Sequence, residues 1–212
     1  MCHSLCVING DCHLAGRPGW KGLTRDAIAL AALEVIDARG LALFGLRGVA
    51  QHLHVRAASL YNHFEDRAEL FRDVVSVLYD TLEFEPEAAD DWRTRTVRHS
   101  LALRRAMLAH PRAVPLVPLH LSRDRCRKDF RRTLADAPIA ANREVAIEMI
   151  EMVTIGSTLL AAAVLEAEQR RLDKGPIHRV DVNREAAFVA ALELALDAIG
   201  ATGEIRHQGR PA

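Results

Sequence analysis

The sequence predicts an all-α protein, in which a long helix joins a three-helix N-terminal helix-turn-helix domain to a larger helical C-terminal domain. Ala and Leu recur throughout the 212 residues while aromatic residues make up only 5%, and this composition favours helices over strands. Apolar residues also repeat at helical spacing in most segments after residue 24. The 50% hydrophobic and 26% charged residues are ordinary for a globular protein with a real core.

Residues 1–23 lack a sustained periodicity and contain four of the twelve glycines, so we interpret them as an N-terminal extension. A metal or redox site is one hypothesis for its Cys and His residues, which are Cys2, His3, Cys6, Cys12 and His13. Their spacing matches no C-x-x-C pair, and a start codon assigned too far upstream explains the segment equally well. We therefore expect no metal, no cofactor and no spaced disulfide framework.

The first helix is predicted over residues 24–40. Thr24 is a favourable N-cap, and Gly40 follows the last turn as helix-ending glycines do. Ile28 and Ile36 belong to one apolar face at helical spacing. The same segment also carries Asp26 in its first turn, where the helix dipole favours an anion.

Two short helices separated by a tight turn follow the link GLALFG. The first is predicted over residues 46–53 and the second within VRAASLYNHF, residues 55–64. Leu60 and Phe64 lie four residues apart and so share the inner face of the second helix. The polar side chains left largely to the other face are Ser59, Asn62 and His63. This arrangement is a helix-turn-helix.

The connecting helix is predicted over residues 67–84, with Asp66 and Glu69 forming a capping box at its start. The segment EPEAADD then marks a boundary, so the first domain covers residues 24–85.

The second domain is predicted over residues 90–203, with helices at 92–109, 123–135, 143–168 and 183–199. Pro111 ends the first of these helices, because proline cannot continue the hydrogen-bond ladder. The helix at 143–168 is the most apolar of the chain. Its centre IGSTLLAAAV is rich in small residues that allow another helix to approach closely.

Charge is distributed unevenly, although the formal net charge is zero. Residues 92–132 hold twelve Arg or Lys against two Asp, whereas residues 1–85 hold eight basic and eleven acidic residues. The basic segment either receives an anionic ligand or forms solvated, paired faces. We favour pairing, since Glu144, Glu148 and Glu151 fall on one side of the next helix.

Membrane and enzyme classes find no support in the sequence. No apolar run reaches the roughly 18 residues that span a bilayer, and the start lacks the basic-then-apolar order of a signal peptide. We therefore expect a cytoplasmic protein with no membrane partner. The chain contains no GxGxxG, P-loop, HExxH or GxSxG motif, so we expect no enzymatic activity.

The segment LRGVAQHLHVRAASLYNHFEDRAEL resembles the N-terminal domain of TetR-family transcriptional repressors. The family pattern Leu-Tyr-x-His-Phe followed by a basic residue is present here as Leu60–Phe64 and Arg67. The resemblance covers about residues 24–85. More distantly, DDWRTRTVRHSLALRRAMLAHP and FVAALELALDAIGA are similar to the first helix and the last dimerisation helix of the regulatory domain in the tetracycline-repressor-like branch.

The resemblance implies a surface that docks in the major groove, with flanking groups on phosphates. Arg47 matches an arginine that contacts phosphate or base in relatives, and Tyr61, His63 and Arg67 match residues that bond phosphates. Ser59 and Asn62 are implied to face the groove. The expected DNA-binding residues are thus Arg47, Arg56, Ala57, Ser59, Tyr61, Asn62, His63 and Arg67, with Ala57 placed for a thymine methyl.

Two positions depart from the family pattern. His54 replaces a glycine at a turn that often needs positive φ, which His tolerates less well. Arg56 replaces the usual Ser or Thr N-cap of the recognition helix, which removes a side-chain cap worth about 1 kcal/mol but places a cation near the groove. In the extension, Arg17, Trp20 and Lys21 are either an arm that touches the minor groove or part of a linker.

A ligand cavity between helices of the second domain is a further hypothesis. Its candidate residues are Trp92, His99, Met107, His110, His120, Met149, Met152 and Thr154, each of which is individually more often core or surface. The tetracycline-binding relatives carry a metal-ligating His where this chain has Val117, with His120 three residues on. A tetracycline and magnesium ligand is therefore not expected.

The main hypothesis is a homodimeric repressor that binds a palindromic operator in double-stranded DNA and releases it on binding a small molecule. The helices near 143–168 and 183–199 are expected to pair with their copies. A helical interaction module or small-molecule-binding protein without specific DNA binding is the alternative. The sequence does not specify the effector, the operator, the regulated genes or repression as opposed to activation.

Overall fold

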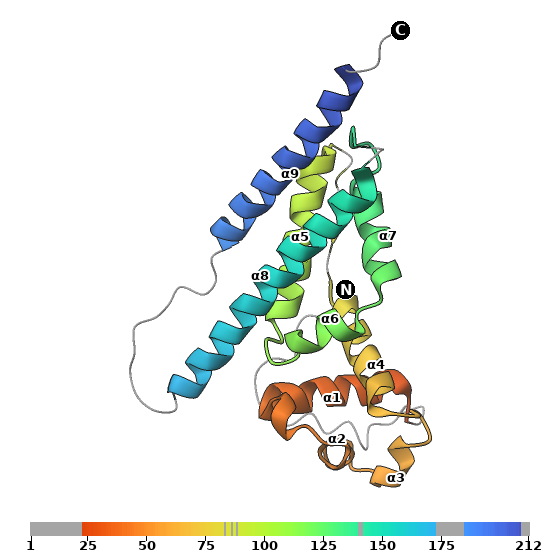
Figure 1. The fold of residues 1–212 in the computed structure, drawn as a ribbon. Coiled ribbons are helices and arrows are strands. Elements are labelled where there is room, and N and C mark those ends of the chain that lie inside the picture. Colours follow the sequence, from red (N-terminus) through yellow and green to blue (C-terminus); the bar gives the residue numbers. More distant parts are fainter. Residues whose placement is uncertain are drawn as a thin grey trace.

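The computed structural model describes residues 23–82, 84–85, 87, 89–139, 142–172 and 185–208. Within these ranges every regular element is a helix, which confirms the predicted all-α class (Figure 1). Most of the predicted extension lies outside the described residues. Its candidate metal and DNA-arm residues therefore stay untested, and these are Cys2, His3, Cys6, Cys12, His13, Arg17, Trp20 and Lys21.

The N-terminal unit lies at one end of the molecule (Figure 1). It consists of α1 (Arg25–Arg39), the 3₁₀ turn η1 (Leu41–Leu43), α2 (Leu46–His52), α3 (Ala57–Leu60) and α4 (Arg67–Asp80). Helix α1 packs against α2 and α4, and α2 packs against α3. The predicted inner-face residues Ile28, Ile36 and Leu60 are at most 1% exposed, and Val49 of α2 and Leu70 of α4 are fully buried in the same core.

Helix α1 begins and ends at the predicted residues. The Thr24 hydroxyl accepts a hydrogen bond from the Ala27 amide at 3.2 Å, and the Gly40 amide donates to the Ile36 carbonyl at 2.7 Å. Gly40 has φ of 78°, a conformation that strains residues with a Cβ. Cap and stop therefore fix the length of the first helix.

The C-terminal region contains α5 (Trp92–Leu108), η2 (Val114–Leu116), α6 (Val117–His120), α7 (Arg123–Thr133), α8 (Arg143–Leu172) and α9 (Glu185–Gln208). The long helices α8 and α9 run antiparallel to each other, and both pack on α5 (Figure 1). Leu103 and Met107 of α5, Ile147 and Ile150 of α8, and Leu192 of α9 are fully buried in this core. Helix α4 reaches from the N-terminal unit to contact α5 and α6.

Several helix ends differ from the predicted ones for identifiable reasons. Helix α4 ends at Asp80 rather than at residue 84, because the Thr81 hydroxyl donates to the Leu78 carbonyl at 2.7 Å and closes the last turn. Thr133 closes α7 in the same way, with a 3.0 Å bond to the Phe130 carbonyl. Helix α9 continues to Gln208, since a single glycine, Gly200, does not stop it.

Helix α8 contains no uninterrupted apolar run of membrane-spanning length, but its average hydropathy is high. Its stretch Arg143–Gln169 is long enough to span a membrane, its most apolar 18-residue window has a mean hydropathy of 1.6, and 39% of that window is buried in the protein. Long core helices of globular proteins meet the same criterion. The rest of this window is not buried within the described chain.

Candidate nucleic-acid interface and ligand cavities

The turn between α2 and α3 has the backbone that the sequence departure at His54 predicted. His54 has φ of 55°, and it is the one non-glycine residue with positive φ among the residues described. The turn is closed by hydrogen bonds from the His54 amide to Gln51 and from the Val55 amide to the Ala50 carbonyl, at 3.2 and 3.0 Å. A histidine in this conformation costs roughly 1–2 kcal/mol relative to glycine. The turn is held closed despite that strain.

Helix α3 is shorter than the predicted second helix. It spans Ala57–Leu60, and its N-cap Arg56 is extended and makes no side-chain cap bond, as predicted from the missing Ser or Thr. A bond of 2.9 Å from the His63 amide to the Leu60 carbonyl carries the chain through one more turn. Leu60 and Phe64 are buried, at 1% and 7% exposed, and anchor this segment to the core.

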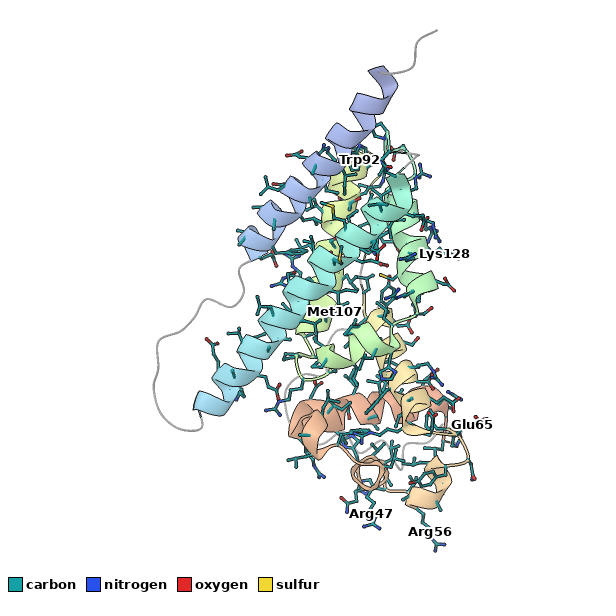
Figure 2. The ribbon with its side chains drawn as sticks, viewed as in Figure 1. Arg47, Arg56, Glu65, Trp92, Met107 and Lys128 are labelled. Atoms are coloured by element: carbon teal, nitrogen blue, oxygen red, sulfur yellow. The ribbon has the colours of Figure 1, made fainter. Side chains whose placement is uncertain are left out.

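The polar face of the motif lies at the end of the molecule opposite the long C-terminal helices. Arg47 from α2 and Arg56 from the start of α3 both project outward there (Figure 2). Tyr61 is 64% exposed, and Asn62 is exposed beside it. The remaining candidates of this segment, Ala57, Ser59 and His63, are partly buried. One surface thus collects most of the predicted DNA contacts, whose individual roles stay predictions.

Arg67 occupies a different environment from the other candidates. Its guanidinium lies over the rings of Phe44 and Phe71, at 5.0 and 4.9 Å from their centroids. It also donates to the Phe44 carbonyl at 3.5 Å. Arg67 therefore connects α4 to the link that precedes α2, while its charge stays at the N-terminus of α4.

Arg25 is a positioning residue that sequence reasoning missed. It donates to the Glu69 carboxylate at 2.5 Å, to Asp73 at 2.9 Å and to the His63 carbonyl at 3.1 Å. Its guanidinium also lies 4.9 Å from the Phe64 ring centroid. Arg25 thus ties the end of the recognition segment to α1 and α4. A cation in the first turn of a helix opposes the helix dipole, and this was the available signal.

The acidic residues next to this surface are held in place by backbone groups. Asp66 accepts from the Glu69 amide at 2.7 Å, as the predicted capping box requires. Glu69 in turn accepts from the Glu65 amide at 2.7 Å, one residue earlier than in the usual box. That backbone bond, with the Arg25 guanidinium, holds the pKa of Glu69 below its usual value. Glu69 is therefore an anion that stabilises the start of α4 and its contact with Arg25.

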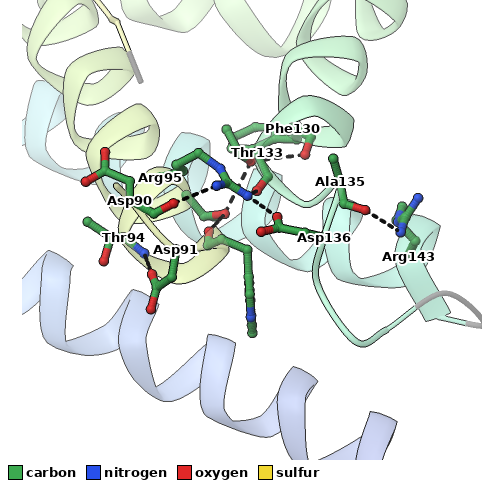
Figure 3. Close-up of polar contacts among 11 residues, drawn as sticks. Asp90, Asp91, Thr94, Arg95, Phe130, Thr133, Ala135, Asp136 and Arg143 are labelled. Atoms are coloured by element: carbon green, nitrogen blue, oxygen red, sulfur yellow. Dashed lines mark hydrogen bonds and ion pairs between the residues drawn. The ribbon is translucent and has the colours of Figure 1, made fainter. Parts of the chain in front are cut away.

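The basic segment of residues 92–132 is largely paired, as predicted. Arg131 binds Glu144 with two hydrogen bonds of 2.9 Å, and Arg127 lies 3.7 Å from Glu151. Figure 3 shows the same behaviour at the start of α5, where Arg95 contacts Asp136 and the carbonyls of Asp90 and Thr133. The positive charge of this segment is therefore used within the fold.

Three cavities lie in or beside the C-terminal region. The first, about 300 Å³, is bounded by α6, α7 and α8 and includes Met152 in its wall. The second, about 380 Å³, lies between the end of α4, α5 and α7 and is lined by His99. The third, about 520 Å³, lies where α1 meets the end of α5 and α8. No group of three or more His, Cys, Asp or Glu side chains that could hold a metal ion occurs in the described ranges.

The structure does not bring the eight candidate ligand residues together. Met107 and Thr154 are fully buried, Met149 packs against the core, and Trp92 lies under the guanidinium of Arg93. His120 packs on the Phe71 ring at a centroid distance of 5.5 Å. His99 and Met152 line two different cavities. The last candidate, His110, lies at the contact with α1 described next.

A polar contact joins the C-terminal end of α1 to the segment that follows α5. Nδ1 of His110 lies 2.5 Å from Oδ2 of Asp37. Arg112 donates to the carbonyls of Asp37 and Ala38 at 2.7 and 3.0 Å, where a helix C-terminus favours a cation. We call His110 and Arg112, with the α1 groups they bind, the α1 clamp. No local sequence pattern marks it, because its partners lie far apart in the chain.

The arrangement of an exposed helix-turn-helix and a helical region with cavities defines the class of a helix-turn-helix transcriptional regulator. Residues 17–74 match the family model described as bacterial regulatory proteins, tetR family. The N-terminal helix-turn-helix domain is therefore that of the tetR family, and the similarities described next support a TetR-family regulator.

Two curated relatives are similar to the chain. An HTH-type transcriptional regulator of Saccharopolyspora erythraea is 30% identical over 94 residues, which are 44% of this chain. The class C tetracycline repressor protein of Escherichia coli is 28% identical over 163 residues, which are 72% of this chain. The chain spans 40% of the length of the first relative and 73% of the second.

Solved structures share the fold over most of its length. BioQ, in a crystal structure with its double-stranded DNA operator, has a TM-score of 0.67 and 22% identity, covering 85% of this chain and 99% of that one. ActR of Streptomyces coelicolor, in complex with (S)-DNPA, has a TM-score of 0.67 and 25% identity, covering 85% and 98%.

Proposed function

We propose that the protein is a homodimeric repressor that binds a palindromic operator and releases it when a small molecule binds the C-terminal region. In this proposal it acts in the cytoplasm and without enzymatic activity. The observation that carries the proposal is the surface formed by Arg47, Arg56, Tyr61 and Asn62, which projects from the helix-turn-helix into solvent. BioQ bound to operator DNA and ActR bound to a small molecule have the same fold and support both halves of the proposal.

Unpartnered apolar side chains on α8 and α9 support the homodimer. Met152 and Leu160 on α8 are 64% and 69% exposed, and Leu194 on α9 is 72% exposed. Exposed alanines at 187, 191 and 198 lie on the same side of α9 as Leu194, while the exposed Asp197 nearby pairs with Arg93 of α5. A face of small and apolar residues on two adjacent helices matches the needs of a four-helix interface. A two-fold dimer presents its recognition helices roughly 34–36 Å apart, at half-sites one turn of DNA apart.

The α1 clamp supports a route from the C-terminal region to DNA. Through it and through α4, the helix-turn-helix is fixed to α5 and α6. A ligand that favours a different placement of α5 or α4 changes the separation of the two recognition helices. It then lowers DNA affinity by the difference in its own binding to the two states.

The test of the proposed function is selection of operators from random double-stranded DNA with the purified full-length protein. We expect an enriched inverted repeat and binding of one dimer per site. A random pool without enrichment, or an enriched site that lacks two-fold symmetry, would contradict the proposal and favour the interaction module.

Substitution of Leu194→Arg tests the dimer separately by analytical ultracentrifugation. We expect the variant to be monomeric, because a charge in a four-helix interface cannot be solvated. Leu119→Arg is the matched control, since Leu119 on α6 is 76% exposed and lies outside the α8–α9 face. A dimeric Leu194→Arg protein, or a monomeric control, would refute the assigned interface.

A further inference from the structure

Each cavity wall includes a buried polar atom without a hydrogen-bond partner, which is Arg127 Nε in the first cavity and Asp37 Oδ1 in the third. The second cavity differs because both polar atoms of one wall side chain, the ring nitrogens of His99, lack a partner. It lies between the C-terminal end of α4, the chain at residues 84–85, α5 and α7. Its volume of about 380 Å³ is at the lower end of the roughly 300–1,000 Å³ of ligand pockets, so a ligand would be small. The wall residues used below include Leu82, Phe84, Arg95, His99, Asp129 and Arg132.

His99 is 2% exposed, and neither of its ring nitrogens has a hydrogen-bond partner in the part of the chain that the structure describes. Its ring makes edge-type contacts with Phe84 and Phe130, at centroid distances of 4.8 and 5.0 Å. Burial lowers the pKa of His99 to about 4, so the ring is neutral near pH 7 and offers one N–H donor and one acceptor nitrogen.

The ring nitrogen of His99 that carries a lone pair needs a hydrogen-bond donor, and the surrounding aromatic rings cannot replace that donor. An N–H can point at an aromatic face, which is electron-rich and acts as a weak acceptor. A nitrogen lone pair cannot, since the same face repels it. A buried acceptor without a donor is costly, so a molecule that fills the cavity gains most if it donates a hydrogen bond to His99.

Two charged side chains of the cavity wall, Arg95 and Asp129, already have hydrogen-bond partners within the protein. Arg95 binds Asp136 and two carbonyls, and Asp129 accepts from the Tyr79 hydroxyl at 2.8 Å. Arg132 lies 3.9 Å from Asp129. Arg132 is 78% exposed and has only this long contact, while the carboxylates of Glu85 and Asp129 also line the wall. The wall therefore favours an uncharged molecule over an anion.

We propose that this cavity binds a small uncharged phenol, whose hydroxyl donates to His99 and whose ring packs against Leu82 and Phe84. Leu82 and Phe84 follow directly after α4, so an occupant contacts the chain that leads to the helix-turn-helix. Assigning this phenol as the effector rests on the proposed function above, whereas its binding to the cavity does not.

Isothermal titration calorimetry on the full-length protein without DNA tests the site. The probes are phenol, cresol and naphthol, each compared with its parent arene (benzene, toluene and naphthalene) and with benzoate. We expect at least one phenol to bind roughly tenfold more tightly than its arene, which is the size of one buried hydrogen bond. Benzoate should bind more weakly than phenol.

The variant His99→Phe should keep arene binding and lose the preference for the hydroxyl. It should also fold, because an apolar group replaces an unsatisfied polar one of similar shape. Long-range ¹H–¹⁵N NMR of the wild-type ring should show the acceptor nitrogen shifting when the phenol binds. The proposal fails if no phenol is preferred over its arene, if the preference survives in His99→Phe, or if the ring nitrogen does not respond.

A parallel titration of the operator complex separates this site from the proposed function. Release of operator by the bound phenol supports both. Calorimetric binding with the hydroxyl preference but no loss of operator affinity supports the site and contradicts its assignment as effector site. Operator release by a different small molecule, without any phenol binding, supports the proposed function and overturns the phenol site.

Discussion

The two ends of the molecule treat their polar side chains in opposite ways. At the helix-turn-helix, the side chains of Arg47 and Arg56 project into solvent, and neither side chain makes a hydrogen bond or ion pair within the described chain. In the C-terminal region, most arginines bind carboxylates or carbonyls, and Arg104 and His99 are buried. The density of positive charge in the sequence is highest where DNA is not expected to bind. Free cations, rather than total charge, mark the candidate DNA surface.

The largest expected effect concerns His99 and acid stability. Its pKa is lowered to about 4 in the folded state, so between that value and about 6.5 the unfolded chain binds the extra proton. Stability is therefore present above pH 6.5 and is lost as the pH falls toward 4, by about 3 kcal/mol in total. Urea unfolding across this range should show the slope in wild type and a smaller slope in His99→Phe. Equal slopes would mean that the His99 ring is solvated, which would contradict the contrast between buried polar groups in the C-terminal region and exposed ones at the helix-turn-helix.

The next effect concerns Arg104, which is 4% exposed and joins α5 to the two long helices. It donates to Ser157 and Thr158 at 3.3 and 3.4 Å and lies over the Phe188 ring. Arg104→Ala should lower the free energy of unfolding by about 2 kcal/mol, because it leaves a cavity and removes the donor to the Ser157 and Thr158 hydroxyls, which keep only their own bonds to the Thr154 carbonyl. Denaturant titration measures this. The control Arg131→Ala, at an exposed pair with Glu144, should change little. If both variants lost similar stability, burial would not distinguish these arginines.

A smaller effect concerns the turn at His54. His54→Gly should raise the free energy of unfolding by about 1 kcal/mol, because glycine adopts φ of 55° without strain. Gly40→Ala, at φ of 78°, should have the opposite sign in the same thermal or urea experiment. A loss of stability in His54→Gly would mean that the histidine side chain contributes more than its backbone costs.

The smallest expected effect is in the α1 clamp, and it appears in DNA geometry rather than in stability. Arg112→Ala removes two hydrogen bonds to the end of α1 and loosens the placement of the helix-turn-helix. We expect the variant to lose less affinity than wild type when one base pair is added between half-sites. Fluorescence anisotropy with both spacers measures this. An identical spacer penalty in the two proteins would show that the clamp does not set the separation.

Local patterns in the sequence predicted the elements that depend on local physics. The cap at Thr24, the stop at Gly40 and the burial of Leu60 and Phe64 follow from short spacings. The positive φ at His54 was anticipated from the family resemblance, in which a glycine is usual at this position. These features need no knowledge of distant contacts.

Features that depend on residues far apart in the chain were not predictable. Arg25 binds groups 38 to 48 residues away, and Arg112 binds groups 74 and 75 residues away. The phosphate contact of Arg67 stays a prediction, and no sequence pattern showed that its guanidinium would also lie over the rings of Phe44 and Phe71. The lack of hydrogen-bond partners at the His99 ring nitrogens likewise depends on which side chains from other helices lie near the ring. Spacing along one helix carries no information on such contacts.

The salt dependence of operator binding tests the central claim most directly. The logarithm of the binding constant falls linearly with that of salt, in proportion to the phosphates neutralised. The double variant Arg47→Ala, Arg56→Ala should bind the selected operator more weakly and lower this slope by roughly one to two. Lys128→Ala, which removes an exposed cation from α7 in the C-terminal region, should leave affinity and slope unchanged (Figure 2). A slope that falls with Lys128→Ala and not with the double variant would contradict the assignment of the DNA surface.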